Sequence, residues 1–167
     1  ILKDISFEAM PGQTVAILGP TGAGKSSLVH LLQGLYDYKE GSITIDGVEL
    51  NTIDKRWLRR HVGIVLQEPF LYSKTIRQNI AFPKDGAAEE EIFEAARIAS
   101  LDDVIREFDK GYETLVGERG VTLSGGQKQR LAIAREMVKV SKVLVFDDSL
   151  SAVDANTDER IREALGA

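Results

Sequence analysis

The segment Gly19-Pro20-Thr21-Gly22-Ala23-Gly24-Lys25-Ser26 constrains the fold of this chain more than any other, because it fits the pattern G-x-x-x-x-G-K-[S/T] at every fixed position. A short apolar run, Thr14 to Leu18, precedes it and predicts a buried strand, and leucines at helical spacing follow it. Strand, glycine-rich turn and helix in this order are typical of a loop that cradles phosphate groups. We therefore expect an α/β fold built around a phosphate-binding loop.

Each part of this loop has a chemical task. The glycines let the backbone curl so that its N–H groups point at phosphate oxygens, and the following helix adds the positive end of its dipole. Lys25 places a positive charge against the β- and γ-phosphates, and the Ser26 hydroxyl ligates Mg²⁺. The alternative is a glycine-rich turn with a merely solvated lysine, and the flanking strand and helix favour the phosphate loop.

A second candidate feature is a pair of carboxylates, Asp147 and Asp148, directly after the apolar run Val143 to Phe146. A buried strand that ends in Asp suits a magnesium site, because open sheets bind ligands at the carboxyl ends of their strands. We expect Asp147 to hold Mg²⁺ through water, and Asp148 to point at the γ-phosphate and polarise the attacking water. Both could instead cap the following segment.

Leu123-Ser124-Gly125-Gly126-Gln127 forms a second glycine-rich helix start, ahead of a helix that carries Leu131 and Ala134. Ser124 is a natural N-cap, so the segment could be an ordinary cap. Two glycines in a first helical turn cost roughly 1 kcal/mol each relative to alanine, which favours close backbone approach to a ligand. The chain thus carries two phosphate-facing surfaces, and either it binds two anions or two copies share ligands between them.

The remaining pattern alternates strands and helices at both ends of the chain. We expect a strand at Ile5 and Phe7, a hairpin with an Asp-Gly turn at 42–50 and a strand at 62–66. Helical periodicity covers residues near 92–99, 104–108 and 131–138, and the residues after the strand at 143–146 read as helical. This pattern predicts an α/β core sheet with a helical block inserted at roughly 74–139.

Composition narrows the function classes. The 167 residues suit one domain, and the formal net charge of −5 argues against a nucleic-acid grip through bulk charge. No apolar run approaches the ~20 residues of a membrane helix, and the absence of Cys excludes thiol chemistry. The basic run at 55–60 favours a short amphipathic helix with a solvated face over a nucleic-acid contact. Because the chain starts without Met and stops inside an expected helix, we expect a piece of a longer protein.

These motifs together resemble the nucleotide-binding domain of ATP-binding cassette (ABC) transporters, and the resemblance covers essentially the whole chain. In the order of that family the motifs are Walker A at Gly19–Ser26, the Q-loop at Gln67, the signature at Leu123–Gln127, Walker B at Val143–Asp147 and the D-loop at Ser151–Asp154. Three further segments resemble exporter-type members: Thr114–Gly120, which looks like the X-loop, Val65–Tyr72 and Thr75–Ile80.

The resemblance implies a P-loop NTPase core sheet (1–73 and 140–167) with an inserted α-helical subdomain (about 74–139), truncated at both ends. It implies ATP and Mg²⁺ as ligands. The implied nucleotide-binding residues are Gly19, Pro20, Thr21, Gly22, Ala23, Gly24, Lys25, Ser26, Ser27, Gln67, Ser124, Gly126 and Gln127. The implied metal ligands are Ser26, Gln67 and Asp147, and the implied catalytic residues are Asp148, Gln67 and Lys25.

The resemblance also implies a mechanism. Two such domains dimerise head to tail, so that Ser124, Gly126 and Gln127 contact a nucleotide held by the partner domain, while Asp154 communicates across the dimer. ATP closes the dimer, and hydrolysis opens it, which drives export by transmembrane domains of the same transporter. The expected place is the cytoplasmic face of the plasma membrane, and no nucleic acid is expected as a partner.

Two departures from the family pattern bear on activity. The family usually has Glu after the Walker B Asp, and here Asp148 is one methylene shorter, which keeps open a degenerate, mainly regulatory half of a heterodimer. Neither His30 nor His61 can be the family's switch histidine, which lies after the D-loop, and its adenine-stacking aromatic would precede Ile1. We therefore expect this fragment alone to hydrolyse ATP weakly. A soluble ABC ATPase is a third reading, and the long insertions usual in that class are absent between Gln67 and Ser124.

Overall fold

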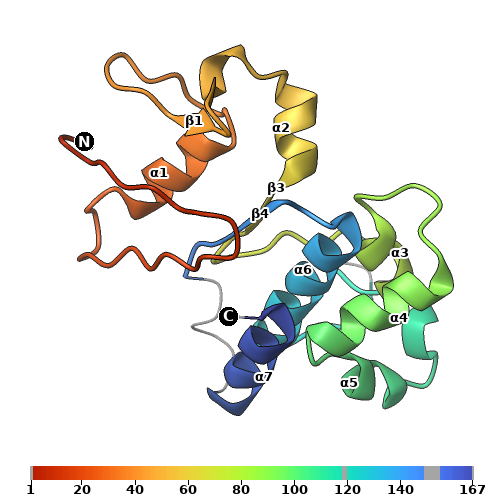
Figure 1. The fold of residues 1–167 in the computed structure, drawn as a ribbon. Coiled ribbons are helices and arrows are strands. Elements are labelled where there is room, and N and C mark those ends of the chain that lie inside the picture. Colours follow the sequence, from red (N-terminus) through yellow and green to blue (C-terminus); the bar gives the residue numbers. More distant parts are fainter. Residues whose placement is uncertain (1, 118–119, 149–154, 167) are drawn as a thin grey trace.

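The computed structural model describes residues 2–117, 120–148 and 155–166, and the side chain of Leu165 is outside this description. Figure 1 shows α1, β1 and α2 on one side of the β3–β4 pair and helices α3 to α7 on the other. The elements are α1 Lys25–Leu32, β1 Thr44–Ile45, β2 Val48–Glu49, a 3₁₀ turn Leu50–Thr52, α2 Lys55–His61, β3 Val62–Val65, α3 Ile76–Ala81, α4 Glu89–Ile98, α5 Asp102–Arg106, a 3₁₀ turn Gly111–Glu113, α6 Gly125–Lys139, β4 Val143–Phe146 and α7 Ala155–Leu165.

The parallel pair β3–β4 lies at the centre of the molecule and confirms the strands expected at 62–66 and 143–146. Its register pairs Val62 with Val143 and Val65 with Phe146. All four residues of β3 are buried, as expected for a short apolar run in a parallel sheet. Since the two strands run in the same direction, the residues that follow them meet at one edge of the sheet.

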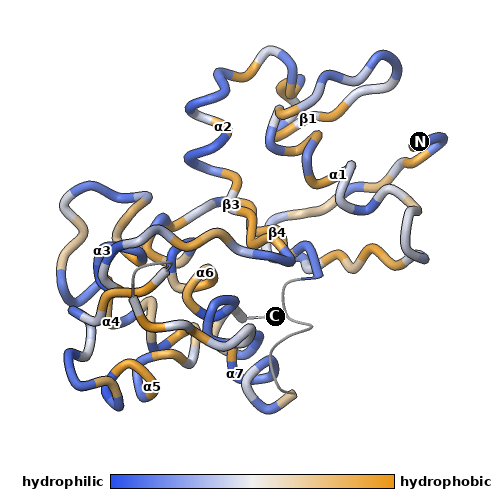
Figure 2. Tube along the Cα trace, turned by 180° about the vertical axis from the view of Figure 1, so that it is seen from behind, coloured by the Kyte–Doolittle hydropathy of each residue, from blue (hydrophilic) through white to orange (hydrophobic). Residues whose placement is uncertain are grey.

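The strands expected at Ile5–Phe7 and Thr14–Leu18 were wrong. Neither segment forms a strand, and the apolar side chains are exposed, Leu18 to 92% and Ile17 to 46%. Figure 2 shows the hydrophobic colouring of this segment along an irregular tube. The physical reason is that a strand needs a hydrogen-bonded neighbour, and among the described residues β3 pairs only with β4. An apolar pattern shows which side chains could be buried, but it does not show whether a neighbouring strand is present to pair with the segment.

Two hydrophobic clusters cover the two sides of β3. The larger one surrounds α6, whose side chains Leu131 and Ile133 are fully buried against α3 and α4, and it includes Val65. The smaller one joins Val29 of α1, Leu58 of α2 and Ile64 of β3. The helices expected near 92–99, 104–108 and 131–138 are confirmed as α4, α5 and α6. The division into a core and a helical subdomain at 74–139 stays a prediction.

The segment between α1 and β3 follows its local sequence signals. Asp46 and Gly47 both have positive φ angles, 50° and 77°, which is the turn that joins two strands with an Asp-Gly pair. Asp54 caps α2, and Leu58 is the buried residue of this helix. The cationic side chains of α2 are all exposed, which confirms the solvated face expected there, and they are Lys55, Arg56, Arg59 and Arg60.

Gly63 in β3 packs directly against a half-buried ion pair, which predicts a stability effect. A Cβ atom at Gly63 would lie 2.5 Å from Glu136 Oε2 and 2.6 Å from Ser141 Oγ. Burial raises the pKa of Glu136, and the neighbouring Lys139, 3.2 Å away, opposes that rise. Lys139 also donates to the carbonyl of Val62, so the carboxylate has little freedom to move aside. We expect Gly63→Ala to lower the free energy of unfolding by about 2–3 kcal/mol.

The measurement is urea unfolding followed by the fluorescence of Trp57, the single tryptophan of the chain. Gly12→Ala is the control, because Gly12 has a φ of +76° and open space around its Cβ position. That control tests positive-φ strain alone and is expected to cost about 1 kcal/mol. Because Gly63 does not have a positive φ, an unchanged free energy of unfolding in Gly63→Ala would show that the contact with Glu136 and Ser141 carries no cost.

Candidate nucleotide site

The glycine-rich loop turns sharply into α1. Gly22 and Gly24 have φ angles of 83° and 96°, a region that side chains with a Cβ atom rarely adopt. Gly24 is the N-cap residue of α1, and no side chain caps the first N–H groups of this helix. Uncapped N–H groups and the positive end of the helix dipole are suited to a phosphate group.

Lys25, the first residue of α1, places its ammonium group inside the loop. Its Nζ donates to the carbonyl oxygens of Gly19 at 2.6 Å and Pro20 at 3.1 Å. These two hydrogen bonds hold the ammonium group of Lys25 against the backbone of the glycine-rich loop. An incoming phosphate would therefore meet both the ammonium and the N–H groups of the helix start.

Ser26 and Asp147 meet although 121 positions separate them in the sequence. Ser26 Oγ donates to Asp147 Oδ1 at 3.2 Å. Asp147 is held at the end of β4 because its N–H donates to the carbonyl of Val65 at 3.0 Å. A hydroxyl and a carboxylate oxygen side by side are the hard ligands that Mg²⁺ prefers, so these residues fit the expected metal.

No group of three or more His, Asp or Glu side chains able to hold a metal occurs in the described part of the chain. A site with one carboxylate and one hydroxyl still suits Mg²⁺, which is commonly bound through one or two carboxylates together with substrate phosphates. Gln67, the third expected ligand, contacts Asp148 instead of Ser26 or Asp147 in the described hydrogen bonds, and its amide Oε1 is the oxygen that a metal could use.

Gln67 and Asp148 lie side by side because of the strand register. Val65 pairs with Phe146, and each of the two polar residues follows two positions after its strand. Gln67 Nε2 donates to Asp148 Oδ2 at 3.3 Å. Asp148 has a φ of 50°, a conformation of higher energy for a residue with a Cβ atom. Strained residues persist where the surrounding structure fixes them, and they occur often at functional sites.

Ser124 is the N-cap of α6, as its sequence predicts, and it also forms a complete capping box with Gln127. Ser124 Oγ accepts from Gln127 N at 3.2 Å, and Gln127 Oε1 accepts from Ser124 N at 2.8 Å. Ser124 and Gly125 are exposed, and Gly126 is half-buried. No hydrogen bond between described residues joins this helix start to Gly19–Ser26. The two surfaces expected to bind anions are therefore not joined by any described hydrogen bond.

Three buried or half-buried polar residues near Gln67 were missed by the sequence reasoning. Gln129 donates through Nε2 to the carbonyl of Gln67. Arg135 donates to the carbonyls of Phe70 and Asn79, at 3.0 and 3.1 Å, and burial lowers its pKa. The buried amide of Asn79 holds Tyr72 through both its oxygen and its nitrogen. One signal was available: Arg135 falls on the helical stripe of Leu131, Ala134 and Val138.

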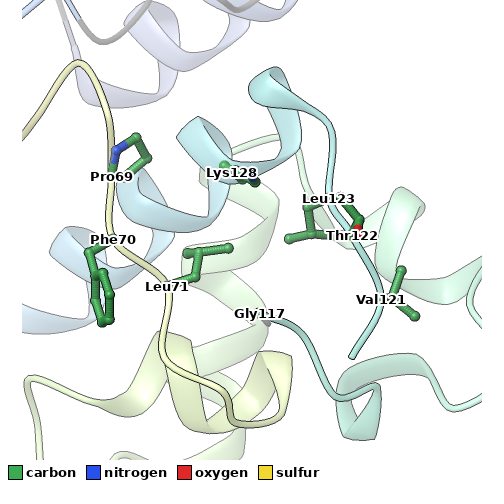
Figure 3. Close-up of a pocket in the computed structure, with 8 residues that line it drawn as sticks. All are labelled: Pro69, Phe70, Leu71, Gly117, Val121, Thr122, Leu123 and Lys128. Carbon is green, nitrogen blue, oxygen red and sulfur yellow. The ribbon is translucent and has the colours of Figure 1, made fainter. Parts of the chain in front are cut away.

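A cavity of about 310 Å³ lies beside α6, between Pro69–Leu71 and the segment that leads into the helix. Figure 3 shows Leu123 and Lys128 at the start of α6 on one side and Leu71 on the other. None of its lining residues belongs to Gly19–Ser26, so the cavity is distinct from the phosphate loop. The expected D-loop, Ser151–Asp154, lies outside the described residues, as do Glu118 and Arg119 of the expected X-loop.

Comparison with known proteins decides the family. Residues 2–151 match the family described as ABC transporter. The chain belongs to this family. Family membership establishes an ATP-binding ABC ATPase domain and agrees with the loop and the Ser26–Asp147 contact. The computed fold is accordingly that of an ABC ATPase, with helix and sheet mixed.

Two relatives show what kind of ABC protein this chain is similar to. The beta-(1→2)glucan export ATP-binding/permease protein NdvA of Bartonella bacilliformis is 50% identical over 97% of this chain. The putative multidrug export ATP-binding/permease protein YgaD of Bacillus subtilis is 48% identical over 99% of it. The chain covers 27% and 28% of these two proteins. The chain thus spans about a quarter of the length of relatives that are exporter-type membrane proteins.

A solved structure supports the same assignment. The structure of a bacterial Atm1-family ABC exporter with ATP bound matches with a TM-score of 0.92 and 46% identity, over 96% of this chain and 28% of that one. Within the described residues, no helix is both long and apolar enough to cross a membrane.

Proposed function

We propose that this chain is the ATP-binding and ATP-hydrolysing domain of an ABC exporter, and that it powers export through ATP-dependent head-to-tail dimerisation. The observation that carries the proposal is the convergence of Lys25, Ser26, Asp147, Gln67 and Asp148 around one edge of the β3–β4 pair. Export by the relatives named above supports the transport role. Both relatives carry export and permease in their names, which does not favour a soluble ABC ATPase.

The residues divide the chemistry of phosphate release among them. Lys25 and the backbone N–H groups of Gly19 and of Thr21 to Ser27 bind and orient the β- and γ-phosphates. Ser26, Asp147 and Gln67 hold Mg²⁺, which neutralises charge on the phosphates when bound. Gln67 orients the attacking water, and Asp148 accepts its proton. The hydrogen bond from Gln67 to Asp148 supports this pairing, because the two side chains lie close enough to act on the same water molecule.

A second nucleotide-binding domain would complete the site. The signature residues Ser124, Gly126 and Gln127 have no hydrogen bond to their own phosphate loop among the described residues, which supports their use on a nucleotide held by the partner. The proposal includes transmembrane partners and a place at the cytoplasmic face of the membrane, and the ATP-binding/permease names of the relatives support it. In this arrangement the isolated chain hydrolyses ATP weakly, because it lacks the second domain.

The identity of Asp148 supports a second candidate function. In it, this chain is the degenerate half of a heterodimer, and its own site binds ATP but hydrolyses it slowly. The side chain is one methylene shorter than the family's usual Glu, and catalysis by a positioned base depends on geometry. Its contact with Gln67, at 3.3 Å, is longer than most strong hydrogen bonds. The intact capping box at Ser124 would then serve a competent site on a different partner.

Metal removal tests the proposed function in the complete polypeptide that contains this chain. Purified in detergent, it is expected to release phosphate from ATP with Mg²⁺ present, and excess EDTA is expected to lower that rate at least about 100-fold. The physical reason is that the Ser26 hydroxyl and the Asp147 carboxylate lie together at the loop, where Mg²⁺ would neutralise charge on the phosphates. Turnover that continues in EDTA, or no ATP binding with Mg²⁺ present, would contradict the proposal.

A further inference from the structure

Gln129 connects α6 to the backbone of Gln67 at a buried position. Its side chain is 3% exposed, and its Nε2 donates to the carbonyl oxygen of Gln67. The other amide atom, Oε1, is buried without a hydrogen-bond partner in the described part of the chain. Burying an amide oxygen without a partner costs free energy, so the position is not favoured by stability alone.

The bonded carbonyl belongs to the residue whose side chain reaches Asp148. Gln67 Nε2 lies 3.3 Å from Asp148 Oδ2, and Gln129 holds the backbone of this same residue. A continuous hydrogen-bonded path therefore runs from Asp148 through Gln67 to Gln129. Arg135, further along α6, donates to the carbonyl of Phe70. Helix α6 is therefore hydrogen-bonded to the backbone at two residues that follow β3, Gln67 and Phe70.

The same helix presents the signature residues. Gln127 and Gln129 are two residues apart, which places their side chains about 200° apart around the helix axis. Gln127 is tied to Ser124 at the exposed helix end, whereas Gln129 points to the buried side. Gln127 and Gln129 lie on one continuous helix, α6, which packs against α3, α4 and β3. Figure 1 shows α6 between the β3–β4 pair and the helices α3 and α4.

We propose that Gln129 is a positioning residue that sets the Gln67–Asp148 pair according to the position of the signature helix. This inference rests on the proposed function, in which Ser124, Gly126 and Gln127 contact a nucleotide held by a second domain. Gln129 then links the two nucleotide sites of a dimer within one chain. It acts through Gln67 and does not touch the nucleotide.

The test is a double-mutant cycle in the complete polypeptide with ATP and Mg²⁺. Gln129→Met keeps the shape of the side chain and removes the donor to Gln67, and it is expected to lower kcat about tenfold while the KM for ATP changes less than about twofold. In a Gln67→Ala background, Gln129→Met is expected to lower kcat by less than about twofold further, because the side chain that Gln129 positions is already gone.

Lys128→Met is the matched control on the same helix, since no described hydrogen bond or ion pair involves the Lys128 side chain, and its kcat is expected to stay within about twofold of the unaltered protein. Gln129→Asn, which keeps an amide but is one methylene too short, serves where Gln129→Met fails to fold and is expected to show the same loss.

Four results separate the inference from its alternatives. Additive losses in Gln67→Ala and Gln129→Met, or a raised KM with unchanged kcat, overturn the positioning role. An unaltered kcat in both Gln129 variants overturns it as well. Absence of ATP turnover in the unaltered polypeptide overturns the proposed function and this inference with it, whereas normal turnover with additive losses overturns the inference alone.

Discussion

Lys25→Met is expected to lower ATP turnover by the complete polypeptide at least about 100-fold, because it removes the only ammonium group within the loop that would meet the β- and γ-phosphates. Methionine retains most of the side-chain volume, so α1 keeps its packing against β3. In the structure this ammonium already lies against the carbonyls of Gly19 and Pro20, inside the curl of the loop. The measurements are phosphate release at saturating ATP and the binding of a fluorescent ATP analogue.

Lys110→Met is the control for this substitution. Lys110 is exposed, precedes the 3₁₀ turn at Gly111–Glu113, and lies far along the chain from the loop. Its loss is expected to leave turnover within about twofold, as for most exposed positions. Equal ATP turnover in Lys25→Met and the unaltered protein would show that Lys25 and its loop have no part in hydrolysis.

Asp148→Glu is expected to raise ATP turnover about tenfold, and Asp148→Asn is expected to lie at least about 100-fold below Asp148→Glu. The longer carboxylate would restore the reach that the family's usual Glu has, whereas asparagine cannot accept the proton of the attacking water. The position is already held beside Gln67 at the end of β4. Steady-state turnover in the complete polypeptide gives the comparison.

Asp148→Asn differs from the native residue by a single atom, so it separates loss of the base from loss of shape. Both variants should bind the ATP analogue as the unaltered protein does, because Asp148 is absent from the phosphate loop itself. An unchanged rate in Asp148→Glu, together with a lost rate in Asp148→Asn, would show that Asp148 is an adequate base. The idea of a degenerate site would then fail.

Local sequence signals predicted well wherever a few neighbouring residues decide the structure. The turn at Asp46-Gly47, the N-cap at Ser124 and the start of α1 at Lys25 were all predicted, because each depends on contacts within about four residues. The motif order also placed the phosphate loop and the acidic strand end in one family. Membership of that family is confirmed by the match over residues 2–151.

Contacts between distant residues were not predictable from spacing. The meeting of Ser26 with Asp147, and of Gln67 with Asp148, depends on the parallel register of β3 and β4. Gln129 and Asn79 are buried although they are polar, so hydrophobic periodicity could not predict their burial. A polar side chain is buried only where a hydrogen-bond partner meets it, and that partner is known only from the tertiary structure. The exposed run at Thr14–Leu18 shows the opposite error, an apolar pattern without a partner strand among the described residues.

The sequence by itself determined the chemical parts of this protein: a glycine-rich loop with Lys25 and Ser26, a strand ending in Asp147, and a second glycine-rich helix start at Ser124. Only the tertiary structure decided which parts meet, because pairing β3 with β4 in one register brings groups that lie far apart in the chain to one sheet edge. It also decided that α6 is bonded to the Gln67 segment, since that contact depends on packing across the core.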